Sequence, residues 1–353
     1  MDSSSRITGI LTPNLTPVDY RGRVDEQQLR SYVDWLIEHG VDGLYPNGST
    51  GEFVRFNQAE RREIVRIVVD QTAGRVPVLA GAAEANARET IEACEHYGEL
   101  GVRAVAIVAP YYYPLSREGV EAYFSEIASQ VSVDVTLYNI PLFASPIEVD
   151  SVIRLASEYP RIIGLKDSSG DLPNLMRMMA AIRPIRDDFS FLTGWDASLA
   201  PFLIAGVDGG TNATSGVVPE LTRAIHRRVV AGDVAEAMRL QYQLIPLFDA
   251  MIGLAEFPAG FRAGAAARGW DLGPGQVPMT ESQRAKIQEA ARLIATQVHD
   301  VVNQVPDTSL NSHGNRSVPS VTGGEEIDSP NHADIDTQAA IEAVVQRVVK
   351  ALT

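Results

Sequence analysis

The chain is poor in cysteine, in basic residues and in long apolar runs. Its single cysteine, Cys94, excludes an internal disulfide, and no apolar run approaches the ~18 residues of a membrane-spanning helix. The first ten residues, MDSSSRITGI, carry no secretory signal pattern. These absences predict a cytoplasmic protein that contains no disulfide and does not associate with a membrane.

Charge and motif content exclude further classes of protein. The formal net charge is −15, so the chain offers no basic stripe for a nucleic-acid partner. Its six histidines are scattered without ligand-like pairing, and neither a dinucleotide-binding, a P-loop nor an H-E-x-x-H motif is present. We therefore expect no metal and no organic cofactor.

Short apolar runs alternate with amphipathic helical stretches up to about residue 230. The predicted strands are 7–13, 43–48, 76–83, 104–110, 134–141, 162–167, 189–194 and 207–214. Eight such units match a (β/α)8 barrel, an α/β fold, better than an open doubly wound sheet. Two more helices are expected at about 232–252 and 281–298, which makes residues 1–300 a barrel with a C-terminal helical extension.

The amphipathic stretch DEQQLRSYVDWLIEHG illustrates the helical pattern. Its residues Leu29, Val33, Leu36 and Ile37 form one apolar stripe, and Gly40 can end the helix.

The composition changes after the predicted barrel. Residues 301–335 are rich in Ser, Asn, Pro and Gly and have no aromatic residue, so we expect a flexible linker. Residues 336–353 place apolar side chains at helical spacing and predict an amphipathic helix. This helix resembles peptides that deliver enzymes to a shell or scaffold protein of a bacterial microcompartment. The alternative is a helix that folds back onto the barrel or pairs within an oligomer.

The stretch IIGLKDSSGD places Lys166 at the end of a buried strand. In a barrel of this kind the C-terminal strand ends carry the active site. A lysine amine between apolar walls loses part of its preference for the charged form, and the neutral amine can form a Schiff base with a ketone. The alternative is a strand-end lysine that extends to solvent.

Two neighbouring strand ends could assist such a lysine. Tyr138, in YNIP, could pass protons during Schiff-base chemistry, although a tyrosine there could equally be a core residue. The stretch NGSTGE brings the hydroxyls of Ser49 and Thr50 together with the open backbone at Gly48, which suits a substrate carboxylate. The alternative is an ordinary turn with hydroxyl caps.

The ordered set NGSTGE, YNIP and GLKDSSGD resembles the N-acetylneuraminate lyase and dihydrodipicolinate synthase family of pyruvate-dependent class I aldolases. The likeness covers residues from about 6 to 298. It implies a (β/α)8 barrel, usually a homotetramer, that takes a small 2-oxo acid. It also implies Lys166 as the Schiff-base lysine, Tyr138 as the proton relay, and Ser49 and Thr50 as carboxylate ligands. We also expect Ser168, in KDSSGD, to contribute to substrate binding.

Three stretches bear on the branch of the family. Synthases usually carry an arginine shortly after the YN-x-P motif, whereas this chain has Leu142 and Phe143 there. The run PYYYPLS resembles the lyase branch, and its Tyr112 matches a tyrosine that family members often insert near the neighbouring subunit's site. The stretch TGWDAS resembles the part of lyases that holds a sugar tail: Gly194 and Asp196 match, and alanine replaces the acidic residue that follows.

The sequence therefore favours a lyase that reversibly cleaves a 2-keto-3-deoxy sugar acid to pyruvate and an aldehyde, most like N-acetylneuraminate lyase. The first alternative is dihydrodipicolinate synthase, which condenses pyruvate with aspartate semialdehyde. A third hypothesis, from another class, is a keto-acid-binding or scaffold protein without turnover. The presence of Lys166, Tyr138 and Ser49 together argues against this third hypothesis.

Overall fold

The computed structural model describes residues 6–304 except 254–255, 276 and 279, together with 342–343 and 345–346. Eight strands form one parallel sheet in the order β2-β1-β8-β7-β6-β5-β4-β3. An isolated parallel bridge between Leu44 and Val78 joins the two ends of this order and closes the barrel. The strands are β1 (Gly9–Thr12), β2 (Gly43–Leu44), β3 (Leu79–Gly81), β4 (Ala104–Val108), β5 (Val135–Asn139), β6 (Ile162–Asp167), β7 (Ser190–Thr193) and β8 (Gly209–Gly210). The predicted (β/α)8 barrel is confirmed.

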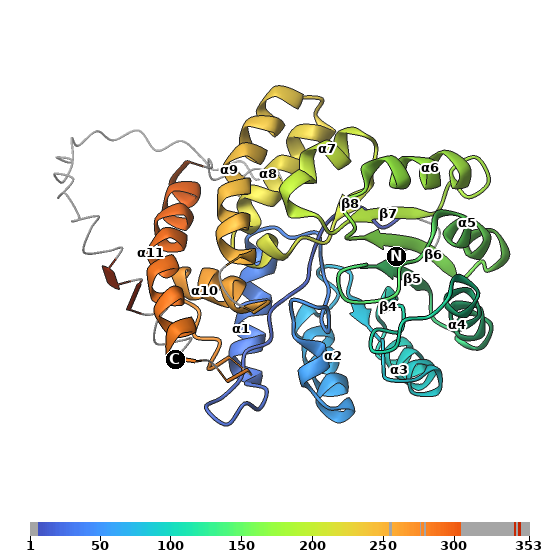
Figure 1. The fold of residues 1–353 in the computed structure, drawn as a ribbon, viewed down its shortest axis with the longest axis horizontal. Coiled ribbons are helices and arrows are strands. Elements are labelled where there is room, and N and C mark those ends of the chain that lie inside the picture. The colour runs from blue at the N-terminus through green and yellow to red at the C-terminus, as the bar shows by residue number, and fades with distance from the viewer. Residues whose placement is uncertain are drawn as a thin grey trace, which may run out of the picture.

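A helix follows every strand and packs outside the barrel (Figure 1). These helices are α1 (Glu26–Glu38), α2 (Gln58–Thr72), α3 (Ala87–Glu99), α4 (Arg117–Gln130), α5 (Val149–Glu158), α6 (Leu172–Ile182), α7 (Leu199–Ile204) and α8 (Pro219–Val230). The extension comprises α9 (Val234–Ile252), α10 (Ala259–Ala267) and α11 (Glu281–Gln304), which gather on one side of the barrel.

Local sequence signals set many of these helix ends. The side chain of Asp25 accepts a hydrogen bond from the Gln28 amide and caps α1. Asn57 and Glu60 form a reciprocal capping box at the start of α2. Gly40 follows the end of α1 with φ of +83°, which confirms the predicted glycine stop.

Two parts of the extension differ from the sequence prediction. Helix α10 was not predicted, because its sequence AGFRAGAAA is short and consists mainly of small residues, and eight of its nine residues are buried. Helix α11 continues to Gln304 rather than ending near residue 298, since Val298 and Val301 are both buried and prolong its apolar face.

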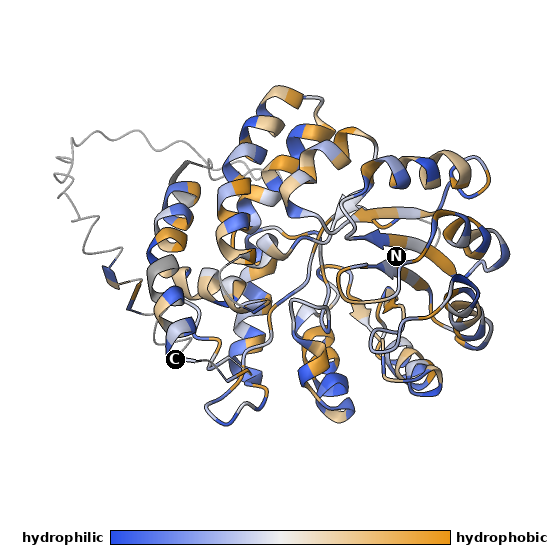
Figure 2. Ribbon diagram, viewed as in Figure 1, coloured by the Kyte–Doolittle hydropathy of each residue, from blue (hydrophilic) through white to orange (hydrophobic). Residues whose placement is uncertain are grey.

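The strands are buried at every position and are mainly apolar rather than alternating, with polar residues concentrated toward their carboxyl ends. Figure 2 shows the result: the strands are largely hydrophobic, and the surrounding helices carry hydrophilic residues along their outer sides. A smaller buried cluster joins Leu11, Tyr45, Leu79, Ala106 and Leu192, which come from or follow five different strands. This cluster fills the inside of the barrel.

The predicted linker and most of the predicted C-terminal helix lie outside the described residues. Within the segment 336–353, residues 342–343 and 345–346 are helical. The Glu342 carboxylate lies 3.6 Å from the Arg292 guanidinium of α11, and the side chain of Val345 is buried. In the described ranges no helix is long and apolar enough to cross a membrane, and no group of histidine, cysteine or acidic residues could hold a metal ion.

Candidate active site

The pairing of β5 with β6 places Tyr138 directly opposite Lys166. Lys166 is 3% exposed, and its amine lies 4.0 Å from the centroid of the Tyr138 ring and 4.7 Å from that of the Tyr45 ring. The ion pairs among the described residues do not include Lys166. Two aromatic faces therefore border the amine, and no carboxylate forms an ion pair with it among the described residues.

Ser49 connects the loop after β2 to the same centre. Its hydroxyl lies 3.3 Å from the Tyr138 hydroxyl, and either oxygen can donate. Thr50 is 5% exposed beside it. The loop turns sharply, because Asn47 and Glu52 both have positive φ, 56° and 62°. The loop thus brings the two predicted hydroxyls to Lys166 and Tyr138.

A buried ion pair holds this loop from behind. Arg262 of α10 lies 2.9 Å from Glu52, and both side chains are almost completely buried. The Arg262 guanidinium also donates to the carbonyls of Thr16 and Gly273. A second guanidinium, that of Arg55, pairs with Glu52. The sequence analysis missed this network, because its key arginine lies on the unpredicted helix.

The ends of β5 and β6 are held together by Asn139 and Asp167. The Asn139 amide donates to the Asp167 carboxylate at 2.7 Å, and Ser169 donates to the other oxygen through its hydroxyl and its backbone N–H. Burial raises the pKa of Asp167, and these hydrogen bonds offset part of that rise. The network fixes the register of the two strands that carry Tyr138 and Lys166.

Gly194 and Ser168 lie against the lysine stem. A Cβ at Gly194 would be 2.0 Å from the Ser168 hydroxyl oxygen and 2.9 Å from Cε of Lys166. The absence of a side chain at Gly194 therefore allows close packing against the lysine stem, and its predicted substrate contact stays a prediction.

Asp196 lines the inner cavity, and its carboxylate is engaged by Thr214. One oxygen of its carboxylate accepts hydrogen bonds from the backbone N–H and the hydroxyl of Thr214, at 2.8 and 2.5 Å. Burial raises the pKa of Asp196, and the hydrogen bonds from Thr214 offset part of that rise. In this arrangement its carboxylate joins the loop after β7 to the loop after β8.

Two other predicted residues lie outside the cavities. Tyr112 is 82% exposed, and its ring contacts that of Tyr113 edge-on at 4.8 Å. Gly48 lies behind the Ser49 loop, where its carbonyl accepts a long hydrogen bond of 3.5 Å from the Phe53 amide. Neither residue lines the space around Lys166 in a single copy of the chain.

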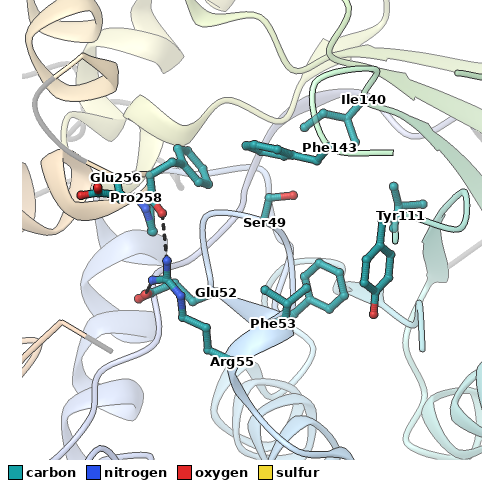
Figure 3. Close-up of a pocket in the computed structure, with 12 residues that line it drawn as sticks. Ser49, Glu52, Phe53, Arg55, Tyr111, Ile140, Phe143, Glu256 and Pro258 are labelled. Carbon is teal, nitrogen blue, oxygen red and sulfur yellow. Dashed lines mark hydrogen bonds and ion pairs between the residues drawn. The ribbon is translucent and has the colours of Figure 1, made fainter. Parts of the chain in front are cut away.

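Two cavities meet at this centre. The inner cavity, of about 70 Å³, is lined by most of the predicted residues: Lys166, Tyr138, Ser49, Thr50, Ser168, Gly194 and Asp196. It also includes Thr211, whose buried hydroxyl has no hydrogen-bond partner among the described residues. The sequence analysis missed Thr211, although it lies in the predicted eighth strand segment. The outer cavity, of about 350 Å³, opens beside Ser49 (Figure 3).

The profile of the Dihydrodipicolinate synthetase family matches residues 6–297. The chain belongs to this family. The resemblance found in the sequence is confirmed, and so is the expectation of an enzyme: the protein is a pyruvate-dependent aldolase of the lyase class.

Similar proteins support this membership. Two proteins named 4-hydroxy-tetrahydrodipicolinate synthase, from Nitratidesulfovibrio vulgaris and Methanopyrus kandleri, are 37% and 35% identical to this chain. The first alignment covers 70% of this chain and 83% of the relative, and the second covers 79% and 92%.

Solved structures agree with the fold. YagE from E. coli K12, a prophage protein of the dihydrodipicolinic acid synthase family in complex with pyruvate, matches with a TM-score of 0.77 and 29% identity over 84% of this chain and 99% of its own. A 2-keto 3-deoxygluconate aldolase from Picrophilus torridus matches with a TM-score of 0.68 and 28% identity over 72% and 90%.

Proposed function

We propose that the protein catalyses reversible carbon–carbon bond formation between pyruvate and an aldehyde through a Schiff base on Lys166. The observation that carries this proposal is the buried amine of Lys166 between two tyrosine rings, with the Ser49 hydroxyl beside that of Tyr138. The similar structure of YagE in complex with pyruvate adds support.

The proposed reaction begins when the Lys166 amine attacks C2 of pyruvate and water leaves, which forms an iminium. Loss of a proton from C3 gives an enamine, with the iminium as electron sink. The enamine C3 then attacks the aldehyde carbon, and the Tyr138 hydroxyl donates a proton to the new alkoxide. Hydrolysis of the iminium releases a 4-hydroxy-2-oxo acid and the free amine. No metal or organic cofactor takes part in these steps.

The remaining residues of the inner cavity suit the carboxylate of pyruvate. Ser49 and Thr50 would bind it through their hydroxyls and through the backbone N–H groups of the sharp loop that follows Gly48. Thr211 offers a further hydroxyl that has no partner among the described residues. Ser168 and Gly194 would border the substrate at the lysine stem.

The identity of the aldehyde separates the two activities expected from the sequence. The names of the similar proteins favour 4-hydroxy-tetrahydrodipicolinate synthase, and hence aspartate semialdehyde, over N-acetylneuraminate lyase. Cleavage of a 2-keto-3-deoxy sugar acid stays a second candidate because of the similar aldolase from Picrophilus torridus. Both are tested by supplying each substrate to the same enzyme preparation.

The first experiment is borohydride reduction in the presence of pyruvate, followed by peptide mapping. The chain has three lysines, Lys166, Lys286 and Lys350, so two internal controls are built in. We expect Lys166 alone to gain the mass of pyruvic acid less one oxygen. An unmodified Lys166 would overturn the Schiff-base mechanism and support the keto-acid-binding hypothesis.

We also propose that the enzyme works as a cytoplasmic homotetramer in which Tyr112 approaches a neighbouring copy's site. The exposure of this ring beside Tyr113 supports the idea, because large exposed aromatic pairs are typical of interfaces. Light scattering on the wild type and on Tyr112→Arg tests it: a wild-type monomer, or a variant with unchanged mass and activity, would count against the assignment.

A further inference from the structure

The outer cavity adjoins the lysine pocket and is lined mainly by apolar side chains. The two cavities share Ser49, Ile140, Phe143 and Phe257, so the outer cavity is the larger space next to a molecule attached to Lys166. The outer volume of about 350 Å³ is several times that of the inner cavity, about 70 Å³. The space for the second substrate therefore exceeds the space for pyruvate.

Aromatic side chains form the walls of this space. The rings of Phe143 and Phe257 lie 5.6 Å apart, and those of Phe53 and Tyr111 lie 5.9 Å apart in an edge-to-face contact. Figure 3 shows Phe143 above Ser49, Phe53 and Tyr111 on the opposite side, and the Tyr111 hydroxyl turned away from Ser49. Apolar rings of this kind bind a flat or branched hydrocarbon body.

The charged residues around the outer cavity are already paired. Among the described residues that line it, Arg55 is the cation, and its guanidinium binds Glu52 and the Phe257 carbonyl. The carboxylate of Glu256 accepts a hydrogen bond from Gln283. A second carboxylate on the aldehyde would thus lose its hydration, and it would gain a cation only by drawing Arg55 away from Glu52, which Arg262 also binds.

Apolar side chains also contribute to the inner cavity. Trp195, Leu142 and Phe248 are among its lining residues, and the ring centroids of Trp195 and Phe248 lie 6.2 Å apart. The polar residues Ser49, Thr50 and Lys166 line the same cavity and would receive pyruvate.

We infer that the aldehyde partner is uncharged and carries an aromatic or branched apolar body that lies between Phe143, Phe257 and Phe53. This inference rests on the proposed lysine chemistry and names the class of its second substrate. It differs from the synthase reaction, whose aldehyde bears a carboxylate and an amine. In the step itself, C3 of the enamine bonds to the aldehyde carbon, the carbonyl oxygen takes a proton, and the hydrocarbon body stays unchanged.

The test measures kcat/KM for pyruvate with five aldehydes: benzaldehyde, 3-methylbutanal, glyceraldehyde, succinic semialdehyde and aspartate semialdehyde. Product formation is followed by mass spectrometry of the 2-oxo acid. We expect benzaldehyde or 3-methylbutanal to exceed both semialdehydes by about 100-fold, because an unpaired charge opposes entry to an apolar site. A preference for either semialdehyde or for glyceraldehyde would overturn the inference.

A pair of variants tests the location. Phe143→Arg adds a cation that has no carboxylate partner, so the aldehyde preference should shift toward succinic semialdehyde by at least about tenfold. Phe143→Leu, the matched control, keeps an apolar wall and should not shift the aldehyde preference toward succinic semialdehyde. If Phe143→Arg fails to fold, as judged by circular dichroism, Leu142→Arg is the substitute, because Leu142 is 71% exposed at the same opening.

The outcomes separate the two proposals. A Lys166 adduct with pyruvate but no turnover of the apolar aldehydes would overturn the inference and leave the proposed function standing. An unmodified Lys166 would overturn both. If a second copy of the chain fills the outer cavity, the apolar aldehydes would gain no advantage, which would also overturn the inference.

Discussion

Lys166 and Tyr138 are register partners on β6 and β5, and the lysine amine lies 4.0 Å from the centroid of the tyrosine ring. The ring borders the amine while its hydroxyl, 3.3 Å from that of Ser49, is positioned to move protons. The same pair of strands therefore supplies both the nucleophile and the group that serves its reaction.

Tyr138→Phe should separate these two contributions. The phenyl ring keeps the packing around Lys166, so the pyruvate adduct should still form on borohydride reduction. Turnover should fall by a factor of about 10² to 10⁴, because proton transfer to the alkoxide is lost. Steady-state kinetics and adduct mapping on one preparation check both expectations.

Tyr45→Phe is the matched control for that substitution. Tyr45 also borders Lys166, at 4.7 Å, but it is fully buried, and burial raises its pKa well above the usual range. Its hydroxyl is therefore poorly suited to proton transfer, and the variant should retain most of its turnover. Equal losses in the two variants would show that ring packing, rather than the Tyr138 hydroxyl, limits the rate.

Gly194→Ala should impair the lysine without unfolding the barrel. The added Cβ would lie 2.9 Å from Cε of Lys166 and 2.0 Å from the Ser168 oxygen, so both side chains must shift. A displacement of about 1 Å at a reacting group can lower a rate by about 100-fold, and the rate of adduct formation should fall by that order. Unchanged adduct formation in a folded variant would contradict the packing role of Gly194.

The sequence predicted the barrel and most of the inner cavity because both depend on local patterns. Alternating strands and helices determine the fold class, and the carboxyl ends of parallel strands meet at one face. Lys166, Tyr138 and Ser49 could therefore be expected to lie together from their positions after strands. Their roles were suggested by motif resemblance, and the geometry now makes those roles chemically testable.

The outer cavity and the support behind the Ser49 loop could not be predicted in this way. Arg262 binds Glu52 across 210 positions of sequence, from a short, buried helix that was not predicted. Phe257 and Phe143 come from distant loops, and only the folded chain brings their rings to 5.6 Å. Long-range contacts of this kind leave no local signal in a single sequence.

Glu52→Gln should destabilise the fold substantially. The substitution leaves Arg262, which is 2% exposed, without its carboxylate partner in a buried position. Breaking one side of a buried ion pair costs about 3–5 kcal/mol of unfolding free energy. Urea unfolding followed by tryptophan fluorescence measures the loss.

Glu236→Gln is the control for this loss. Glu236 pairs with Arg239 at 2.7 Å on the exposed side of α9, where solvent screens the pair and its loss should change stability little. If both variants lose the same small amount of unfolding free energy, the ion pair of Glu52 with Arg262 does not stabilise the loop significantly.

Asp196→Asn should change how stability depends on pH. Burial raises the pKa of Asp196 above 3.8, so the folded protein holds this proton more tightly than the unfolded chain. The stability that Asp196 contributes is full below its unfolded value and is lost as pH rises through the raised folded value. Asparagine does not titrate. The unfolding free energy of the variant minus that of the wild type should therefore increase with pH from about 4 and then level off.

Asp188→Asn serves as the control for that experiment, because its difference in unfolding free energy should change with pH in the opposite direction. The hydrogen-bonded Arg186 guanidinium holds the pKa of Asp188 below its usual value, so its contribution is present above 3.8 and is lost as pH falls through the folded value. The same difference, measured by urea unfolding between about pH 3 and 8, should become more negative as pH rises and then level off. If the difference in unfolding free energy changes in the same direction with pH in both variants, then the titration of other groups, and not the environment of Asp196, sets the pH dependence.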